Sequence, residues 1–232
     1  MKKITSLLLT VLMLATMLSV FAVPAFASET KTAEEYLSEA AQLENAGKYG
    51  TAAGAYLDAA DLYRNTNVPV SAADAYMKAG ECYKKAESFI SAADAYNSAA
   101  ELYKEENIPA SAADAYMKAG ECYEKKNSFE TATTNFLNAA GEYQTAGDYA
   151  TTAYAYMKAG ECFLKNGKFS DAGLCFSNAA EAARSKANEQ KTGSTLSEGS
   201  LVIIVGVACL AVGFLAATLI FKKKKPAPPD GE

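Results

Sequence analysis

A cysteine occupies the same place in three copies of one phrase. The sequence SAADAYMKAGECY runs over residues 71–83 and again over 111–123, and the related TTAYAYMKAGECF covers 151–163. The cysteines of the three copies are Cys82, Cys122 and Cys162. A cysteine nucleophile needs a base, usually histidine, and the chain contains no histidine. We therefore predict that the protein is not an enzyme and has no catalytic residue.

The spacing of these cysteines also decides whether they could form disulfides or bind a metal ion. Copies that recur every 40 residues predict neighbouring repeat units, whose equivalent positions lie about 8–10 Å or more apart. A disulfide needs Cα atoms within about 7 Å, and zinc needs ligands that converge on one point. We therefore expect structural thiols on the flank of a packed face, with no metal and no cofactor.

The phrase belongs to a longer repeat. Residues 29–188 divide into eight blocks of 20 without insertion or deletion, and we number the positions of each block as columns 1 to 20. Column 8 is aromatic in every block, and column 12 is Ala or Gly in every block. The blocks begin at Glu29, Tyr49, Pro69, Phe89, Pro109, Phe129, Tyr149 and Phe169. A fixed period of this kind predicts a repeat architecture.

Each block is predicted to form one amphipathic helix, which makes the fold all-α. Columns 4, 5, 8, 11, 12 and 15 fall on one face at about 100° per residue. Ser or Thr in column 3 of six blocks, often with Asp three residues later, resembles a capping box. Gly or Asn in column 19 of six blocks favours the left-handed conformation that ends helices. We expect eight helices of about 14 residues and turns of about five or six.

The aromatic and glycine columns allow two interpretations. The column-8 rings could form a binding ladder, but their place in the middle of the apolar stripe favours the core. Column 12 is glycine in the first helix of three of the four pairs: Gly80, Gly120 and Gly160. A glycine costs about 1 kcal/mol inside a helix, so we expect a helix backbone to approach closely there.

Blocks alternate in type, so that two helices make a unit of 40 residues. The first helix of a unit carries an aromatic residue, a glycine and a second aromatic residue, and an alanine follows twelve residues after the glycine. This pattern resembles the tetratricopeptide repeat, with Tyr in place of Trp. These residues are Tyr76, Gly80, Tyr83, Tyr116, Gly120, Tyr123, Tyr156, Gly160 and Phe163. The longer paired helices are more similar to the soluble NSF attachment proteins (SNAPs), the cytosolic adaptors of membrane fusion. The resemblance implies a right-handed α-solenoid of four helix pairs over residues 28–188 and a protein or peptide partner.

The two ends of the chain predict sorting segments. Lys2 and Lys3, an apolar run and Ala25-Phe26-Ala27 indicate a signal peptide over 1–27, although an uncleaved N-terminal anchor is an alternative. A polar, flexible linker is expected over 189–200. Residues 201–221 carry no charge and reach about 31 Å as a helix, enough for a transmembrane span. The lysines at 222–225 place the tail, 222–232, in the cytosol and the repeats outside the cell membrane.

Charge narrows the choice of partner. Residues 28–200 hold 25 Asp and Glu against 16 Lys and Arg, a formal net charge of −9, which excludes a nucleic-acid partner. The polar face of the first helices carries a repeated Lys and Glu pair, which we call the charged ridge: Lys78, Glu81, Lys118, Glu121, Lys158 and Glu161. These side chains could form ion pairs within each helix. Alternatively, they could line a groove for a partner.

The sequence thus predicts a membrane-anchored, extracytoplasmic scaffold that mediates protein–protein interaction. One alternative is a SNAP-like adaptor in membrane trafficking, which would need its repeats in the cytosol. Another is a structural surface protein that associates with itself.

Overall fold

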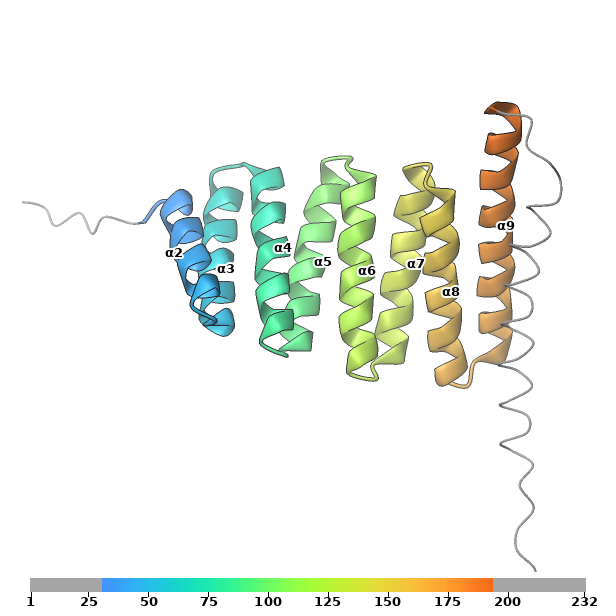
Figure 1. Ribbon diagram of the computed structural model, residues 1–232, viewed down its shortest axis with the longest axis horizontal. Helices are drawn as coiled ribbons and strands as arrows, with labels where there is room; N and C mark the ends of the chain where they lie inside the picture. The colour runs from blue at the N-terminus through green and yellow to red at the C-terminus, as the bar shows by residue number, and fades with distance from the viewer. Residues whose placement is uncertain (1–30, 194–232) are drawn as a thin grey trace, which may run out of the picture. The chain divides into compact units, whose positions relative to one another are not determined.

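Eight α-helices make up the computed structural model, which describes residues 31–193 (Figure 1). No strand occurs in that range. The helices are α2 (Ala33–Asn45), α3 (Tyr49–Asn65), α4 (Pro69–Lys85), α5 (Phe89–Glu105), α6 (Pro109–Lys125), α7 (Phe129–Thr145), α8 (Tyr149–Lys165) and α9 (Phe169–Gly193). The predicted all-α fold and the number of helices over this range are confirmed.

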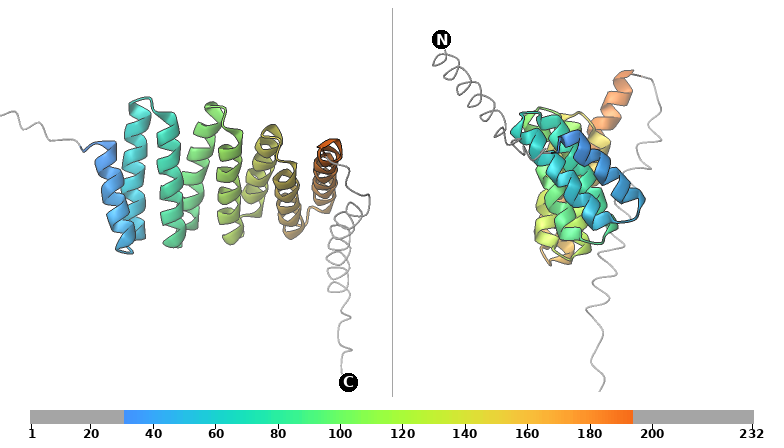
Figure 2. Two further views of the ribbon diagram at one scale, coloured as in Figure 1. Left: turned by 45° about the horizontal axis from the view of Figure 1, so that its top comes forward. Right: turned by 90° about the vertical axis from the view of Figure 1, so that its left-hand side faces the viewer.

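The helices are arranged in a row, each one antiparallel to the next (Figure 1). In the described part of the chain, extensive helix–helix contacts join only consecutive helices, from α2 with α3 through α8 with α9. The same succession is visible when the row is turned (Figure 2). An array in which each unit contacts only its neighbours is an α-solenoid.

The helices are longer than predicted, and the turns are shorter. Helices α3 to α8 each have 17 residues, and only three residues separate one helix from the next. Each begins at column 1 of its block, so the Ser or Thr of column 3 already lies in the first turn and the predicted capping boxes are wrong. Pro69 and Pro109 instead take the first helical position, where a missing N–H costs nothing. Among helices α3 to α8, α8 alone has a side-chain cap, since Asp148 accepts from the Thr151 amide.

The last two residues of each block, in columns 19 and 20, form the turn that ends one helix and begins the next. The residue in column 19 has a positive φ, as predicted for Gly47, Asn67, Asn107, Asn127, Gly147 and Gly167. Glu87 takes the same conformation, with φ 58°. The next amide then donates to a carbonyl five residues back, for example from Val68 to Tyr63 at 2.8 Å, as in a Schellman motif. Val68 is also the N-cap of α4, which explains why the turns are so short.

The core is built from alanine and aromatic columns. Columns 4, 5, 8, 11 and 12 are buried through the middle of the array, as predicted. Of the repeat-defining aromatics, Tyr76 and Tyr116 are buried. Four others are partly buried against the core clusters: Tyr83, Tyr123, Tyr156 and Phe163. The aromatic columns are therefore core. Burial also reaches columns 7 and 14 of the first helices, through Ala75 and Cys82 in α4.

The three glycines of the phrase make room for an aromatic ring rather than for a helix backbone. A Cβ added at Gly80 would lie 2.6 Å from a ring carbon of Tyr96. Gly120 has the same relation to Phe136, at 2.7 Å, and Gly160 to Phe176. A Cβ does not fit at such distances, so the column-8 ring of each second helix lies against the glycine of the helix before it.

The C-terminal helix extends past the predicted boundary. Helix α9 continues to Gly193, so the first residues of the expected linker are helical. Between residues 31 and 193, no helix is both long and apolar enough to cross a bilayer. The predicted signal peptide at 1–27, the span at 201–221 and the tail at 222–232 lie outside the described residues.

Candidate functional site

The charged ridge lies on the first helices of three successive pairs. Lys78 and Glu81 are on α4, and their equivalents 40 and 80 residues later are on α6 and α8. These residues occupy one structural position that is repeated along the array. A partner extended along the row would contact equivalent side chains from more than one repeat.

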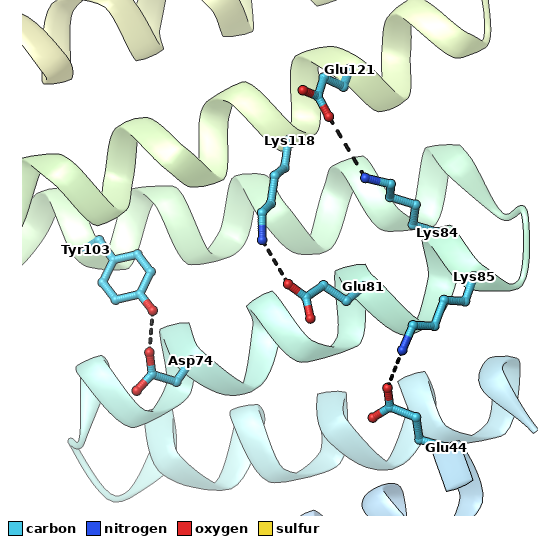
Figure 3. Close-up of polar contacts among 8 residues, drawn as sticks. All are labelled: Glu44, Asp74, Glu81, Lys84, Lys85, Tyr103, Lys118 and Glu121. Atoms are coloured by element: carbon cyan, nitrogen blue, oxygen red, sulfur yellow. Dashed lines mark hydrogen bonds and ion pairs between the residues drawn. The ribbon is translucent and has the colours of Figure 1, made fainter. Parts of the chain in front are cut away.

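Ion pairs on the ridge and beside it join neighbouring repeats, which corrects the predicted pairing within helices. The Lys118 ammonium on α6 lies 2.8 Å from a Glu81 oxygen on α4, and Lys84 lies 3.9 Å from Glu121 (Figure 3). Lys85 of α4 reaches back to Glu44 of α2 at 2.6 Å. Only Lys158–Glu161, at 3.6 Å, is a described pair within one helix. Helices that are not consecutive are thereby tied across the helix between them.

The ridge lysines also cover aromatic rings. Lys78 lies 5.7 Å from the ring centre of Tyr56, Lys118 lies 5.6 Å from that of Tyr96, and Lys158 lies 5.5 Å from that of Phe136. These are cation–π distances. Each of these three lysines therefore lies over a column-8 ring, so the polar face of the first helices borders the aromatic stripe.

The most enclosed charges of the ridge are at its C-terminal end. Lys158 lies 2.7 Å from Glu124, and each side chain is only 17% exposed. Burial alone would raise the pKa of Glu124, but hydrogen bonds from Lys158 and Lys165 outweigh it, and its pKa is lowered. Lys158 is thus engaged in the structure and is the ridge lysine least available to a partner.

Hydrogen bonds from tyrosine to carboxylate form a second periodic network that sequence reasoning missed. A tyrosine in column 15 donates to the carboxylate in column 6 of the preceding helix, 29 residues earlier. Figure 3 shows one such bond, from Tyr103 to Asp74. The full set is Tyr63–Glu34, Tyr103–Asp74, Tyr123–Asp94 and Tyr143–Asp114. The recurring 29-residue interval was the available signal.

Tyrosines of column 8 make a related bond at three junctions. Tyr76 donates to Asp61 at 2.7 Å, Tyr116 donates to Glu101, and Tyr56 donates to Glu44 at 3.2 Å. Tyr96 differs from these three: its side chain is fully buried and its hydroxyl has no partner. The carboxylate in the corresponding position is Glu81, which is paired with Lys118 instead.

A shallow, open pocket of about 370 Å³ is lined in part by the Tyr96 side chain. Its lining comes from three helices: Glu81, Lys84 and Lys85 of α4, Tyr96 of α5 and Lys118 of α6. Three lysines against one glutamate give the lining a net positive charge, although the predicted external segment is strongly acidic. The arrangement suits an anionic group.

The cysteines are placed for packing. Cys82, Cys122 and Cys162 are buried in the interior rather than on the flank, and each is free. Burial raises the pKa of each thiol to about 11, so the thiols are protonated at neutral pH. Residues 31–193 contain no cluster of side chains suited to hold a metal ion.

A comparison with known protein families identifies the family to which this repeat architecture belongs. A family model described as soluble NSF attachment protein, SNAP, matches residues 15–190, which is most of the chain. The chain belongs to the SNAP family. No curated protein matches it.

Two solved structures share the fold of this SNAP-family chain. BtubC (BKLC) from P. vanneervenii is similar over 74% of this chain and 71% of its own, with 19% identity and a TM-score of 0.50. The apo form of RapI is similar over 84% and 74%, with 15% identity and a TM-score of 0.50. At such identities the likeness concerns the fold alone. It supports the tetratricopeptide-like helical repeat expected from the sequence.

Proposed function

We propose that this protein is a membrane-anchored scaffold whose repeat domain lies outside the cytoplasm and binds a protein partner along the charged ridge. Tetratricopeptide-like repeat folds are typical of scaffolds for protein–protein interaction. The sorting segments predicted at 1–27 and 201–221 support the anchoring and the orientation.

One observation carries the binding role. The ridge presents the same Lys and Glu positions on α4, α6 and α8, and ion pairs across repeats hold these helices to one another. Such ties limit the movement of one repeat against the next. A partner therefore meets a preorganised surface and loses less conformational freedom on binding.

Site-specific photo-crosslinking in native membranes tests this proposal. A photoreactive residue replaces Glu81, whose side chain is 51% exposed on the ridge. The matched control replaces Ser91, an exposed residue on the second helix α5. We expect a protein adduct from position 81 and none from position 91. Adducts from position 91 alone would move the binding surface to the second helices, and an adduct with the chain itself would favour self-association.

Family membership favours a second candidate, an adaptor in membrane trafficking. The SNAP match covers the repeats, and such an adaptor would need them on the cytosolic side. The two candidates therefore differ in topology, and protease protection of the repeats decides between them.

A further inference from the structure

The tyrosines of column 8 show what the pocket lacks. Tyr76 on α4 donates to Asp61 on the preceding helix, and Tyr116 on α6 donates to Glu101 on the preceding helix. In both cases the carboxylate lies 15 residues before the tyrosine. The same interval from Tyr96 leads to Glu81, but Glu81 lies 2.8 Å from Lys118. The Tyr96 hydroxyl is one of two buried side-chain polar atoms between residues 31 and 193 that have no partner; the other, Asn97 Oδ1, does not line the pocket.

A buried hydroxyl without an acceptor destabilises a folded protein, because it has lost its hydrogen bonds to water and gained none in return. The fold itself does not need that hydroxyl, because Phe136 occupies the equivalent position one repeat later and lies against Gly120 as Tyr96 lies against Gly80. Burial raises the pKa of Tyr96, so the hydroxyl is a hydrogen-bond donor at neutral pH. It is therefore a buried donor without a partner, on a residue that lines the pocket.

The lysines around the pocket define the charge of that acceptor. Lys84 is only loosely paired, 3.9 Å from Glu121, and Lys118 is held by the half-exposed Glu81. A carboxylate that enters the pocket can pair with both ammonium groups once Glu81 turns toward solvent. It can also accept from the Tyr96 hydroxyl, which is buried in this structure, once the Lys118 ammonium that lies 5.6 Å from the centre of the Tyr96 ring shifts to pair with it.

We propose that the pocket between α4, α5 and α6 binds a side-chain carboxylate of an acidic partner peptide, held by Tyr96, Lys84 and Lys118. This inference rests on the proposed scaffold function, because it names the chemistry of a partner at one part of the charged ridge. A peptide is favoured over a small metabolite, since the pocket is shallow and continuous with an extended row of charges.

The test measures binding of a fluorescent peptide to the full-length chain in detergent. The probe is an acetylated and amidated peptide of alternating Glu and Gly, so that its only carboxylates are side chains. The matched peptide carries Gln in place of Glu. We expect Y96F to weaken binding of the Glu peptide about tenfold, the loss of one hydrogen bond to a charged acceptor. K84Q and K118Q should each weaken it as well and reduce its dependence on salt.

Two controls separate the pocket from general effects. Y116F removes a hydroxyl that already donates to Glu101, so it should lower stability and leave peptide binding unchanged. Y96F should not lower stability, because its hydroxyl has no partner. K104Q removes an exposed lysine that pairs with Glu142, outside the pocket, and should change binding little.

The outcomes distinguish this inference from the scaffold proposal. Equal binding by Y96F and the natural chain, equal binding of the Glu and Gln peptides, or a loss of stability in Y96F as large as in Y116F would each overturn the pocket. If position 81 still captured a partner by photo-crosslinking, the scaffold function would stand without it. Y96F-sensitive peptide binding with no partner captured from position 81 would support the pocket and contradict the proposal that a protein partner extends along the whole ridge.

Discussion

Gly120→Ala tests the tight contact between a helix and the ring of the next helix. Two effects of the added methyl group oppose each other. At an exposed position inside a helix, alanine makes the helix about 1 kcal/mol more stable than glycine does. However, the new Cβ would lie 2.7 Å from a carbon of the fully buried Phe136 ring, and overpacking a tight core costs about 1–3 kcal/mol.

Gly141 supplies the matched control, because it lies inside α7 and a Cβ there meets nothing within 4 Å. Gly141→Ala should therefore stabilise the repeat domain by about 1 kcal/mol. Gly120→Ala should be about 1–3 kcal/mol less stable than that control. At about 2–4 °C per kcal/mol for a domain of this size, the two melting temperatures should differ by about 2–12 °C.

The assay is thermal and urea unfolding of residues 28–193, followed by circular dichroism at the helix band. A Phe136→Leu variant checks the cause, since a smaller side chain should reduce the cost of Gly120→Ala by more than about 0.5 kcal/mol. If the two glycine variants raised the melting temperature equally, the ring contact would not be tight. The same would follow if the effects of Gly120→Ala and Phe136→Leu were strictly additive.

Three further predictions concern the thiols, the tyrosines and the membrane. Replacing Cys82, Cys122 and Cys162 by Ala should cost about 1 kcal/mol each, the loss of one methyl-sized buried group; partner binding should persist, and its loss with the fold intact would contradict a structural role. Burial raises the pKa of Tyr56 to about 12 and also raises that of Tyr76. Because the unfolded tyrosines ionise near pH 10, stability should be complete below that pH and be lost as the pH rises through the folded pKa values; urea midpoints that match at about pH 9 and 11 would refute this. Protease added to spheroplasts should digest the repeats and spare the tail at 222–232, whereas protected repeats would favour the trafficking adaptor.

Periodicity made much of the fold predictable from the sequence. Column 8 had to be buried, because it lies at the centre of an apolar face repeated eight times. Column 19 had to allow a positive φ, because Gly or Asn recurs there, and even Glu87 follows the pattern. The helix starts were misplaced because the N-cap is not a capping side chain: a residue such as Val68 closes one helix and begins the next through its backbone.

The direction of the ion pairs could not be read from the sequence. Spacings of three and four residues are visible on one helix, and they suggested pairs such as Lys78 with Glu81. In the structure Glu81 faces Lys118 on another repeat instead. Which partner a long side chain chooses depends on the separation of helices, and that separation is set by the alanine and glycine columns rather than by the charged residues.

The same choice of partner limits how tightly the pocket can hold its ligand. A carboxylate that pairs with Lys118 replaces Glu81 there, so that ion pair is exchanged rather than gained. The new interaction is the hydrogen bond from Tyr96, and a hydrogen bond to a charged group contributes about 1.5–3 kcal/mol. The corresponding junctions at Tyr76 and Tyr116 are already closed by Asp61 and Glu101. One carboxylate can therefore fix the register of an acidic partner, but strong binding must come from several contacts along the ridge acting together.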